Sequence, residues 1–346
     1  MCNLVGYAGN RPAAPILIEM LKKQEGFDGG MSTGIATVHE GRIYMRKIVG
    51  NIDTLLRETD ALELPGTIGI MHSRPGGDMV THAHPFMTEN DETAVILNGT
   101  LPADDNMDNR NMWAQKFEEE GFVFPSEFEG GDRCTNPKLK NGNFVHDTEF
   151  VAHLMTHFHK FENMSYEDAL AKAIEEAYFD MVVLMLSKNE PDTIFANRLS
   201  RPMYVMLSGE ESFLSTCEFG FPKIDGATKM SLPLFHTCKI ERGRFTVTKS
   251  KAQNICVGEI TPKSYAEGYD RMVKYFDEHT DDLPYFDTFE FLITREWKDL
   301  FTSTNKCGQY ARLAYELLYQ LDSEGRLGYE DRVTEKGRRI TYMYLK

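Results

Sequence analysis

The chain has 346 residues, of which 26% are charged and 41% are hydrophobic, and its formal net charge is −15. This is the composition of a globular protein with one large domain and an appendage, or with two domains. A negative charge of this size disfavours binding to nucleic acid or to an anionic membrane, because both interactions depend on Lys and Arg that neutralise phosphates.

The sequence carries no sign of a membrane span or a targeting segment. No run approaches the roughly 18 apolar residues that a spanning helix needs. The amino terminus lacks the basic stretch and apolar core of a signal peptide. We therefore expect a cytoplasmic protein, in which the Asn-x-Ser/Thr sequences at Asn98 and Asn163 occur by chance.

The first hundred residues are predicted to form mostly strands. Residues 3–8 have the pattern of a buried strand, and residues 14–24 that of a helix with Pro15 near its first turn and an apolar face. Four further runs are predicted as strands: 33–40, 41–50, 66–73 and 92–99. Their short spacing favours hairpins and an antiparallel sheet.

The next part of the chain is predicted to be helical and then to return to strands. Residues 104–121 and 147–161 have helical patterns on either side of a loop at 127–143, and Ser165-x-x-Asp168 resembles a capping box that starts another helix. Further strands are predicted at 181–188, 193–198, 203–209 and 211–217. This order favours a layered α+β domain that ends near residue 258.

Six cysteines are present, and Cys2 stands at an unusual position. Removal of the initiator methionine would give it a free α-amino group of pKa roughly 8, which can act as a base for its own thiol. The alternative is a cysteine that stands second by chance. The other five lack Cys-x-x-Cys spacing and are interpreted as small buried hydrophobic residues: Cys134, Cys217, Cys238, Cys256 and Cys307.

Several motifs support the catalytic interpretation of Cys2, because they occur in a particular order. They are MCNLVGY, GNRPAAPILIEMLKK, GTIGIMHSR, THAHP, VILNG and HDTEFVAHLM. Over roughly residues 2–240 they resemble the glutaminase domain of class II glutamine amidotransferases, most closely the branch that aminates a sugar phosphate. For residues 2–258 this resemblance implies the N-terminal-nucleophile hydrolase fold, an α+β four-layer αββα sandwich.

The resemblance also implies roles for individual residues. Cys2 would attack the glutamine side-chain amide, and Asn98 and Gly99 would stabilise the oxyanion. Arg74 would bind the substrate carboxylate and Asp147 the substrate ammonium. From the sequence alone, Asn98-Gly99 can also be a plain hairpin turn, and Asp147 can also be the N-cap of the following helix.

Two groups of residues have spacings that could bind a metal. They are His82 with His84, and Glu149 with His153 and His157 on one helix face. No further well-placed ligand joins either group, so a polar or partly buried face is favoured for the second. For the first, the resemblance implies that His84-Pro85 has a structural role near the glutamine pocket. No metal or organic cofactor is implied.

The chain departs from the family pattern at three places. Asn3 stands where the family has glycine after the nucleophile. The 75–81 loop has two glycines where the family closes a lid with an aromatic residue, and residues 26–32 replace an arginine–glycine–tyrosine–aspartate stretch. The altered 75–81 loop predicts slow basal turnover, because lid closure commits the substrate to reaction.

Residues 260–346 are predicted to form a small, mostly helical C-terminal module. Helices near 286–300 and 304–322, followed by a hairpin at 326–346, resemble a winged helix. Residues 261–346 contain 13 Lys+Arg and 16 Asp+Glu, too few basic groups for a DNA-binding surface. A protein-docking or dimerising role is favoured, and 86 residues are too few for the isomerase of the look-alike enzymes.

The sequence thus predicts an enzyme that hydrolyses glutamine to glutamate through a Cys2 thioester. The ammonia would go to a separately encoded synthase or ligase. One alternative is a glutamine-sensing or scaffolding module with poor turnover. Another alternative is an amidase of the same fold that acts on a different amide. Arg74 and Asp147 disfavour this alternative, because a cation and an anion together suit the carboxylate and ammonium of a free amino acid.

Overall fold

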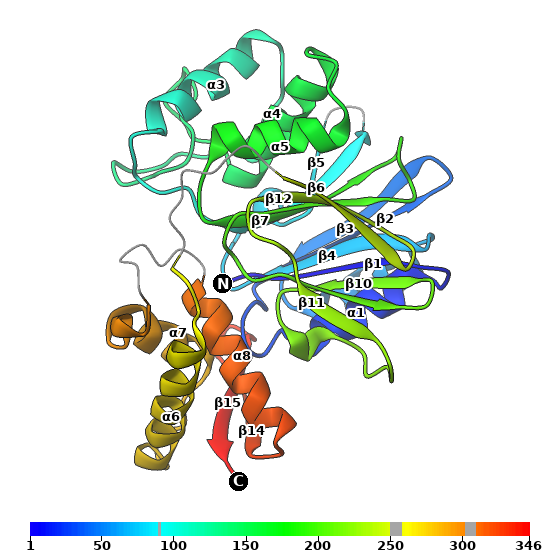
Figure 1. Ribbon diagram of the computed structural model, residues 1–346. Coiled ribbons are helices and arrows are strands. Elements are labelled where there is room, and N and C mark those ends of the chain that lie inside the picture. The colour runs from blue at the N-terminus through cyan, green and yellow to red at the C-terminus, as the bar shows by residue number, and fades with distance from the viewer. Residues whose placement is uncertain (89–90, 250–257, 302–308) are drawn as a thin grey trace.

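The computed structural model describes residues 1–88, 91–249, 258–301 and 309–346. Two antiparallel sheets pack face to face in its larger part (Figure 1). The strands of the first sheet are β1 (Asn3–Ala8), β2 (Ser32–His39), β3 (Arg42–Val49), β4 (Ile68–Arg74), β9 (Tyr204–Ser208), β10 (Glu211–Ser215) and β11 (Thr228–Ser231). Their order is β11-β9-β10-β1-β4-β2-β3, which puts β1 in the middle.

The second sheet has the order β13-β12-β8-β7-β6-β5. Its strands are β5 (Phe86–Met87), β6 (Thr93–Gly99), β7 (Met181–Ser187), β8 (Ile194–Arg198), β12 (His236–Glu241) and β13 (Arg244–Lys249). The sequence patterns predicted most of these strands, but not the two-residue β5 or β11 to β13.

Helices cover the outer face of each sheet. The 3-10 helix η1 (Ala61–Glu63) lies with α1 (Ala13–Lys22) and α2 (Ile52–Glu58) against the first sheet. The second sheet is covered by α3 (Met107–Glu119), α4 (Asp147–Lys160) and α5 (Tyr166–Ala177). The predicted four-layer αββα sandwich is therefore confirmed.

Strand β1 shows why the layers form. Leu4 and Ala8 belong to the apolar cluster between the two sheets, whereas Val5 and Tyr7 belong to the cluster under α1 and α2. Successive side chains of a strand point to opposite faces, so a strand covered on both faces must be apolar throughout. All six residues of β1 are buried. Because the strand is held on both faces, the position of Cys2, which directly precedes it, is fixed as well.

Among its described residues, the C-terminal module contains three α-helices, a short 3-10 helix and a hairpin: α6 (Pro262–Glu278), α7 (Phe286–Arg295), η5 (Lys298–Leu300), α8 (Gln309–Ser323), β14 (Leu327–Val333) and β15 (Arg339–Leu345). Helix α7 ends five residues before the predicted end at 300, and residues 304–308 of the next predicted helix lie outside the described part. The domain limits of 2–258 and 260–346 and the winged-helix likeness stay predictions.

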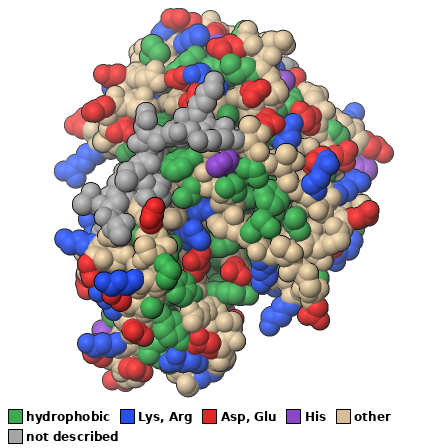
Figure 2. All heavy atoms as spheres, in the orientation of Figure 1, with side chains coloured by type: hydrophobic (Ala, Val, Ile, Leu, Met, Phe, Trp, Pro, Cys, Tyr) green, Lys and Arg blue, Asp and Glu red, His purple; other side chains and the backbone are tan. Residues whose placement is uncertain are grey.

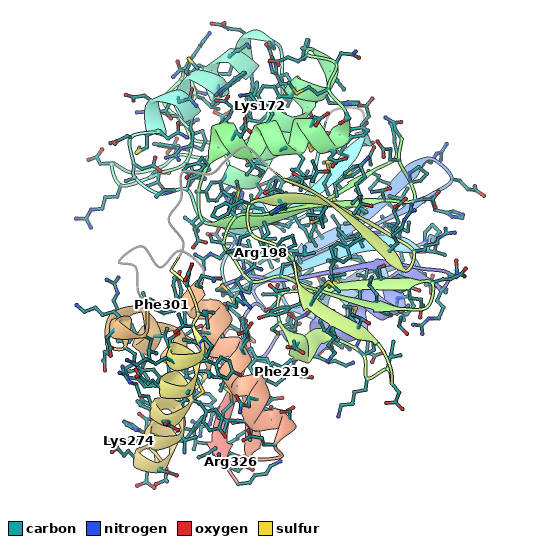
Figure 3. All side chains as sticks on the ribbon, viewed as in Figure 1. Lys172, Arg198, Phe219, Lys274, Phe301 and Arg326 are labelled. Carbon is teal, nitrogen blue, oxygen red and sulfur yellow. The ribbon has the colours of Figure 1, made fainter. Side chains whose placement is uncertain are left out.

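The C-terminal module packs against the first sheet. Phe27 and Cys217 belong to the same apolar cluster as the module's helices. Phe219 lies at this border (Figure 3), with its ring 4.6 Å from that of Phe27 and 5.3 Å from that of Tyr319 on α8. The amino terminus lies in the same region (Figure 1).

The face drawn in Figure 2 has Lys and Arg side chains scattered among Asp and Glu. Among the described helices, none combines the length and the apolar character that crossing a membrane requires.

Candidate active site

The ends of four elements meet at one cavity of about 550 Å³. Cys2 directly precedes β1, Arg74 ends β4, Asn98 and Gly99 end β6, and Asp147 begins α4. His84 lies on the segment between β4 and β6. All six residues that the resemblance singled out line this cavity.

Cys2 is partly exposed, and Met1 is still attached to it. Its nitrogen is therefore an amide, which donates a hydrogen bond to Oδ1 of Asn98 at 3.4 Å. Burial raises the pKa of the Cys2 thiol to about 11. Because the thiolate is the nucleophile, a cysteine in this state is a poor one near neutral pH.

The Met1 ammonium is itself buried and forms an ion pair with Asp28. Burial alone would lower its pKa, but the carboxylates of Asp28 and Glu290 outweigh that effect and raise the pKa to about 10. The amino terminus thus lies in an acidic environment.

Asn98 and Gly99 are strand residues. They pair with Val182 and Met181 of β7, so the interpretation as a hairpin turn is wrong. Nδ2 of Asn98 donates to the Met1 sulfur at 3.7 Å, and it therefore points to the methionine and not into a turn.

Gly99 has a packing reason to be glycine. A Cβ at this position would lie 2.6 Å from the carbonyl oxygen of Asp180 and 2.8 Å from Cβ of Met181. A larger residue would have to displace the backbone of the loop before β7. The glycine therefore permits the close approach that brings its backbone to the cavity.

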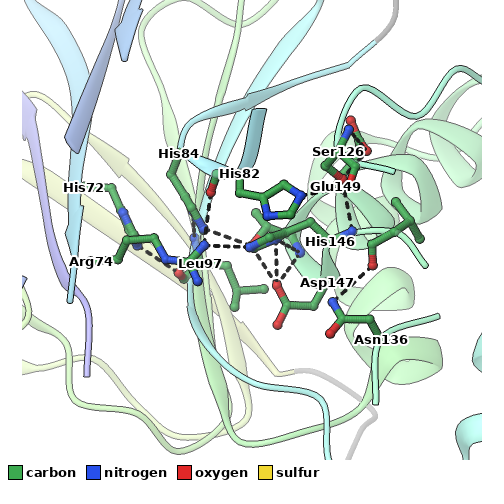
Figure 4. A network of polar contacts seen from close by, with 12 residues as sticks. His72, Arg74, His82, His84, Leu97, Ser126, Asn136, His146, Asp147 and Glu149 are labelled. Carbon is green, nitrogen blue, oxygen red and sulfur yellow. Dashed lines mark hydrogen bonds and ion pairs between the residues drawn. The ribbon is translucent and has the colours of Figure 1, made fainter. Parts of the chain in front are cut away.

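Arg74 and Asp147 are joined by His146 (Figure 4). Nη1 of Arg74 lies 2.8 Å from Nε2 of His146, and Nδ1 of His146 lies 2.9 Å from Oδ1 of Asp147. Burial opposes ionisation of Asp147, but His146 and Arg74 outweigh it and lower the pKa of the carboxyl. Asp147 is therefore favoured as a carboxylate, and His146 links it to Arg74.

His146 occupies the N-cap position of α4, and Asp147 is the first helical residue. The interpretation of Asp147 as the N-cap is therefore wrong. Its carboxylate still accepts a hydrogen bond from the Thr148 amide at 2.8 Å. A carboxylate in the first turn is favoured by the helix dipole as well.

His84 is buried and packed into the protein. Its ring stacks on that of His72 with 3.8 Å between centroids, and Nδ1 accepts a hydrogen bond from the Leu97 amide at 3.3 Å. Nε2 lies 3.4 Å from Oγ1 of Thr148. Burial is the main cause that lowers the pKa of His84 well below the usual value, so the ring is neutral.

Three further segments contribute residues that sequence reasoning missed. Phe128 and Asn136, from the loop predicted at 127–143, line the cavity, so an aromatic residue is present although the 75–81 loop lacks one. Glu290 of α7 and Tyr310 of α8 line it as well. No local sequence signal marks these residues, because the docking of distant segments places them.

Arg201 connects these wall residues. Its Nε lies 2.9 Å from Oδ2 of Asp180, its Nη1 lies 3.9 Å from Oε1 of Glu290, and its guanidinium lies 5.6 Å from the centre of the Tyr310 ring. The C-terminal module therefore forms one wall of the cavity that contains Cys2.

The other candidate ligands and cysteines have separate surroundings. Glu149 accepts from Ser126, His153 contacts the Val123 carbonyl, and His157 contacts Glu120. Within the described residues, no group of three His, Cys, Asp or Glu is placed to hold a metal. Cys217 and Cys238 are buried as predicted, Cys134 is partly exposed, and Cys256 and Cys307 lie outside the described residues.

The sequence is similar to glutamine–fructose-6-phosphate aminotransferases. It is 29% identical to that of Pyrococcus horikoshii over 223 residues, which are 62% of this chain and 32% of the relative. It is 31% identical to that of Caldanaerobacter subterraneus over 219 residues, which are 62% of this chain and 31% of the relative. The chain thus matches about a third of the length of these curated relatives. No protein-family model matches it.

The structure is similar to that of the glutamine phosphoribosylpyrophosphate amidotransferase of B. subtilis, solved with ADP and GMP. The TM-score is 0.60 at 15% identity, and the match covers 96% of this chain and 68% of that one. At this identity the likeness shows a shared fold.

Proposed function

The predicted likeness to class II glutamine amidotransferases with an N-terminal nucleophile is confirmed, and from it we propose that this chain hydrolyses glutamine to glutamate and ammonia. The supporting observation is that a thiol, a cation, an anion and an amide surround one cavity: Cys2, Arg74, Asp147 and Asn98. Arg74 binds the α-carboxylate and Asp147 the α-ammonium, which places the side-chain amide of glutamine toward Cys2.

The reaction begins once Met1 has been removed. The new α-amine of Cys2 takes the proton of its thiol, and the thiolate forms a C–S bond with the side-chain carbonyl carbon. The carbonyl electron pair moves to the oxygen, which accepts hydrogen bonds from the Asn98 side chain and the Gly99 amide.

Collapse of this intermediate breaks the C–N bond. The α-ammonium returns its proton to the leaving nitrogen, which departs as ammonia and leaves a thioester. A water molecule, deprotonated by the same amine, then attacks the thioester, and glutamate is released with the thiol restored.

Met1 removal serves two purposes in this scheme. It converts the Cys2 amide into an amine, and it frees Nδ2 of Asn98 from the methionine sulfur that it contacts at 3.7 Å. The base and one oxyanion donor therefore become available in a single processing step.

The decisive test is glutamate release by protein whose intact mass shows that Met1 is absent. We expect release from this protein and none from Cys2→Ala. A tag that extends the amino terminus should abolish release, whereas a tag at the carboxyl terminus should not. Full activity with the extended amino terminus would contradict the mechanism. Glutamine binding without release would favour the sensor alternative.

A finer part of the proposal concerns the ammonia. We propose that a separately encoded synthase or ligase uses it, because the described residues after 258 form three α-helices, the 3-10 helix η5 and a hairpin around one small core. Mixing the protein with candidate synthases tests this: a true partner should accelerate glutamate release and consume the ammonia.

A further inference from the structure

His146 lies between the two residues that are proposed to hold glutamine (Figure 4). Its ring is buried, with 8% of the residue exposed, and it contacts Arg74 through Nε2 and Asp147 through Nδ1. Neither the motifs nor the proposed mechanism assigns it a role.

The contacts determine which ring nitrogen carries the proton. A guanidinium can only donate hydrogen bonds, so Nε2 of His146 must be the unprotonated acceptor for Arg74. The neutral ring then has its proton on Nδ1, which donates to Oδ1 of Asp147. The Thr148 amide also points to Nδ1 at 3.2 Å, a contact in which Nδ1 would have to accept. A protonated Nδ1 cannot accept, so the Thr148 amide donates to Oδ1 of Asp147, which lies closer at 2.8 Å.

Packing holds the ring in this orientation. The ring of Phe86 stacks on it with 4.8 Å between centroids. The backbone N–H of His146 donates to Oγ of Ser126 at 3.0 Å. A ring fixed in this way sets the positions of both of its partners.

We propose that His146 is a positioning residue, which holds Arg74 and Asp147 at the separation that the carboxylate and ammonium of one amino acid require. The proposal rests on the proposed glutaminase function. Within the described residues, the contacts of Arg74 with the protein use Nη1, to His146 and to the His82 carbonyl at 3.0 Å. Nε and Nη2 are therefore left for a substrate carboxylate, which they can bind as a fork.

The bridge needs an acceptor at Nε2 and a donor at Nδ1. A side chain that offers one of each can replace the imidazole in part, whereas an aromatic ring without nitrogen atoms cannot.

The test measures the Kd for glutamine by calorimetry. Protein with Cys2→Ala binds without turnover and serves as the reference. In this background His146→Gln keeps an acceptor for Arg74 and a donor for Asp147, whereas His146→Phe keeps only a ring. His159→Gln, on the same helix but outside the cavity lining, is the control.

We expect His146→Phe to raise Kd about tenfold to a hundredfold, while kcat with Cys2 present changes much less. His146→Gln should recover part of the lost affinity, and His159→Gln should leave Kd unchanged. An unchanged Kd in His146→Phe, or no recovery in His146→Gln, would overturn the proposal.

A second measurement separates this proposal from the function on which it rests. Nitrogen-15 NMR of the neutral His146 ring should show its proton on Nδ1, whether or not glutamine binds. If the reference binds no glutamine, the proposed function fails. A proton on Nε2 in the neutral ring would exclude the bridge itself.

Discussion

At position 2, the chemistry of the thiol depends on the residue before it. With Met1 attached, the pKa of Cys2 is raised to about 11 and its nitrogen is an amide. Without Met1, an amine of pKa roughly 8 stands beside the thiol. Under the proposed mechanism, the same cysteine is therefore inert in one form of the chain and a nucleophile in the other.

Alkylation should report this difference. Protein that retains Met1 should react slowly with iodoacetamide at Cys2 near neutral pH. The rate should rise about tenfold for each pH unit toward the pKa, because the thiolate fraction does. Protein without Met1 should react readily near neutral pH.

Peptide mass spectrometry follows the label, and the partly exposed Cys134 provides an internal control with no adjacent amine. Equal Cys2 rates for the two forms at neutral pH would mean that the amine does not activate the thiol.

Substitutions around the cavity should fall into two classes: those that weaken glutamine binding and those that slow turnover. Arg74→Lys and Asp147→Asn each remove a charge-assisted hydrogen bond worth roughly 1.5–3 kcal/mol, so KM should rise about tenfold to a hundredfold. Asn98→Ala removes an oxyanion donor, so kcat should fall about a hundredfold or more. Steady-state kinetics of glutamate release decide this, and an Asn98→Ala effect confined to KM would remove its catalytic role.

At the scale of elements, antiparallel pairing brings the site together. Asn3 at the start of β1 pairs with Ser73 near the end of β4. Cys2 and Arg74 therefore lie beside each other where these two neighbouring strands of the first sheet meet the cavity. The second sheet stacks on the first and adds the end of β6. Residues far apart in sequence thus meet because the ends of these strands lie on the same side of the two sheets.

The C-terminal hairpin docks on the stretch where the chain departs from the family pattern. Nε of Arg338 donates to the Gly29 carbonyl at 3.0 Å, and its Nη2 lies 3.3 Å from Oδ1 of Asp28. The Thr341 amide donates to the Gly26 carbonyl at 2.8 Å. The hairpin therefore holds residues 26–29 in place, the segment in which Asp28 forms an ion pair with the Met1 ammonium.

Arg338→Ala should destabilise the protein, because the buried Asp28 carboxylate loses a partner. We expect the free energy of unfolding to fall by about 1–3 kcal/mol. Denaturant unfolding measures it, and Arg332→Ala, an exposed arginine of the same hairpin, should change little. Equal effects of the two substitutions would show that the Asp28 contact is not stabilising.

On the scale of the whole molecule, the C-terminal module completes a wall of the cavity and contributes Glu290 and Tyr310 to it. It is nevertheless a small unit with one apolar cluster. Supplied with glutamine or ammonia, the protein should therefore form no aminosugar phosphate from fructose-6-phosphate. Mass spectrometry of the products checks this, and any aminosugar would mean that residues after 258 carry a synthase site.

Much of the fold could be predicted from local patterns. The alternating and continuous apolar runs marked β1 to β4 and β6 to β10, because burial on one or both faces leaves that signature. Strands β11, β12 and β13 were missed, since partly exposed strands carry weaker patterns. Ser165 was correctly predicted as a cap, because its hydrogen bond to the Asp168 amide is local.

For the candidate site, the sequence by itself determined which chemical groups are available and in what order they occur. Ordered motifs singled out six residues that line one cavity. The tertiary structure alone decided how those groups are coupled. His146 bridges Arg74 and Asp147, the methionine ammonium meets Asp28, and Glu290 faces the cavity from a helix nearly three hundred residues away in the chain. These contacts depend on long-range packing, which no local periodicity or spacing encodes.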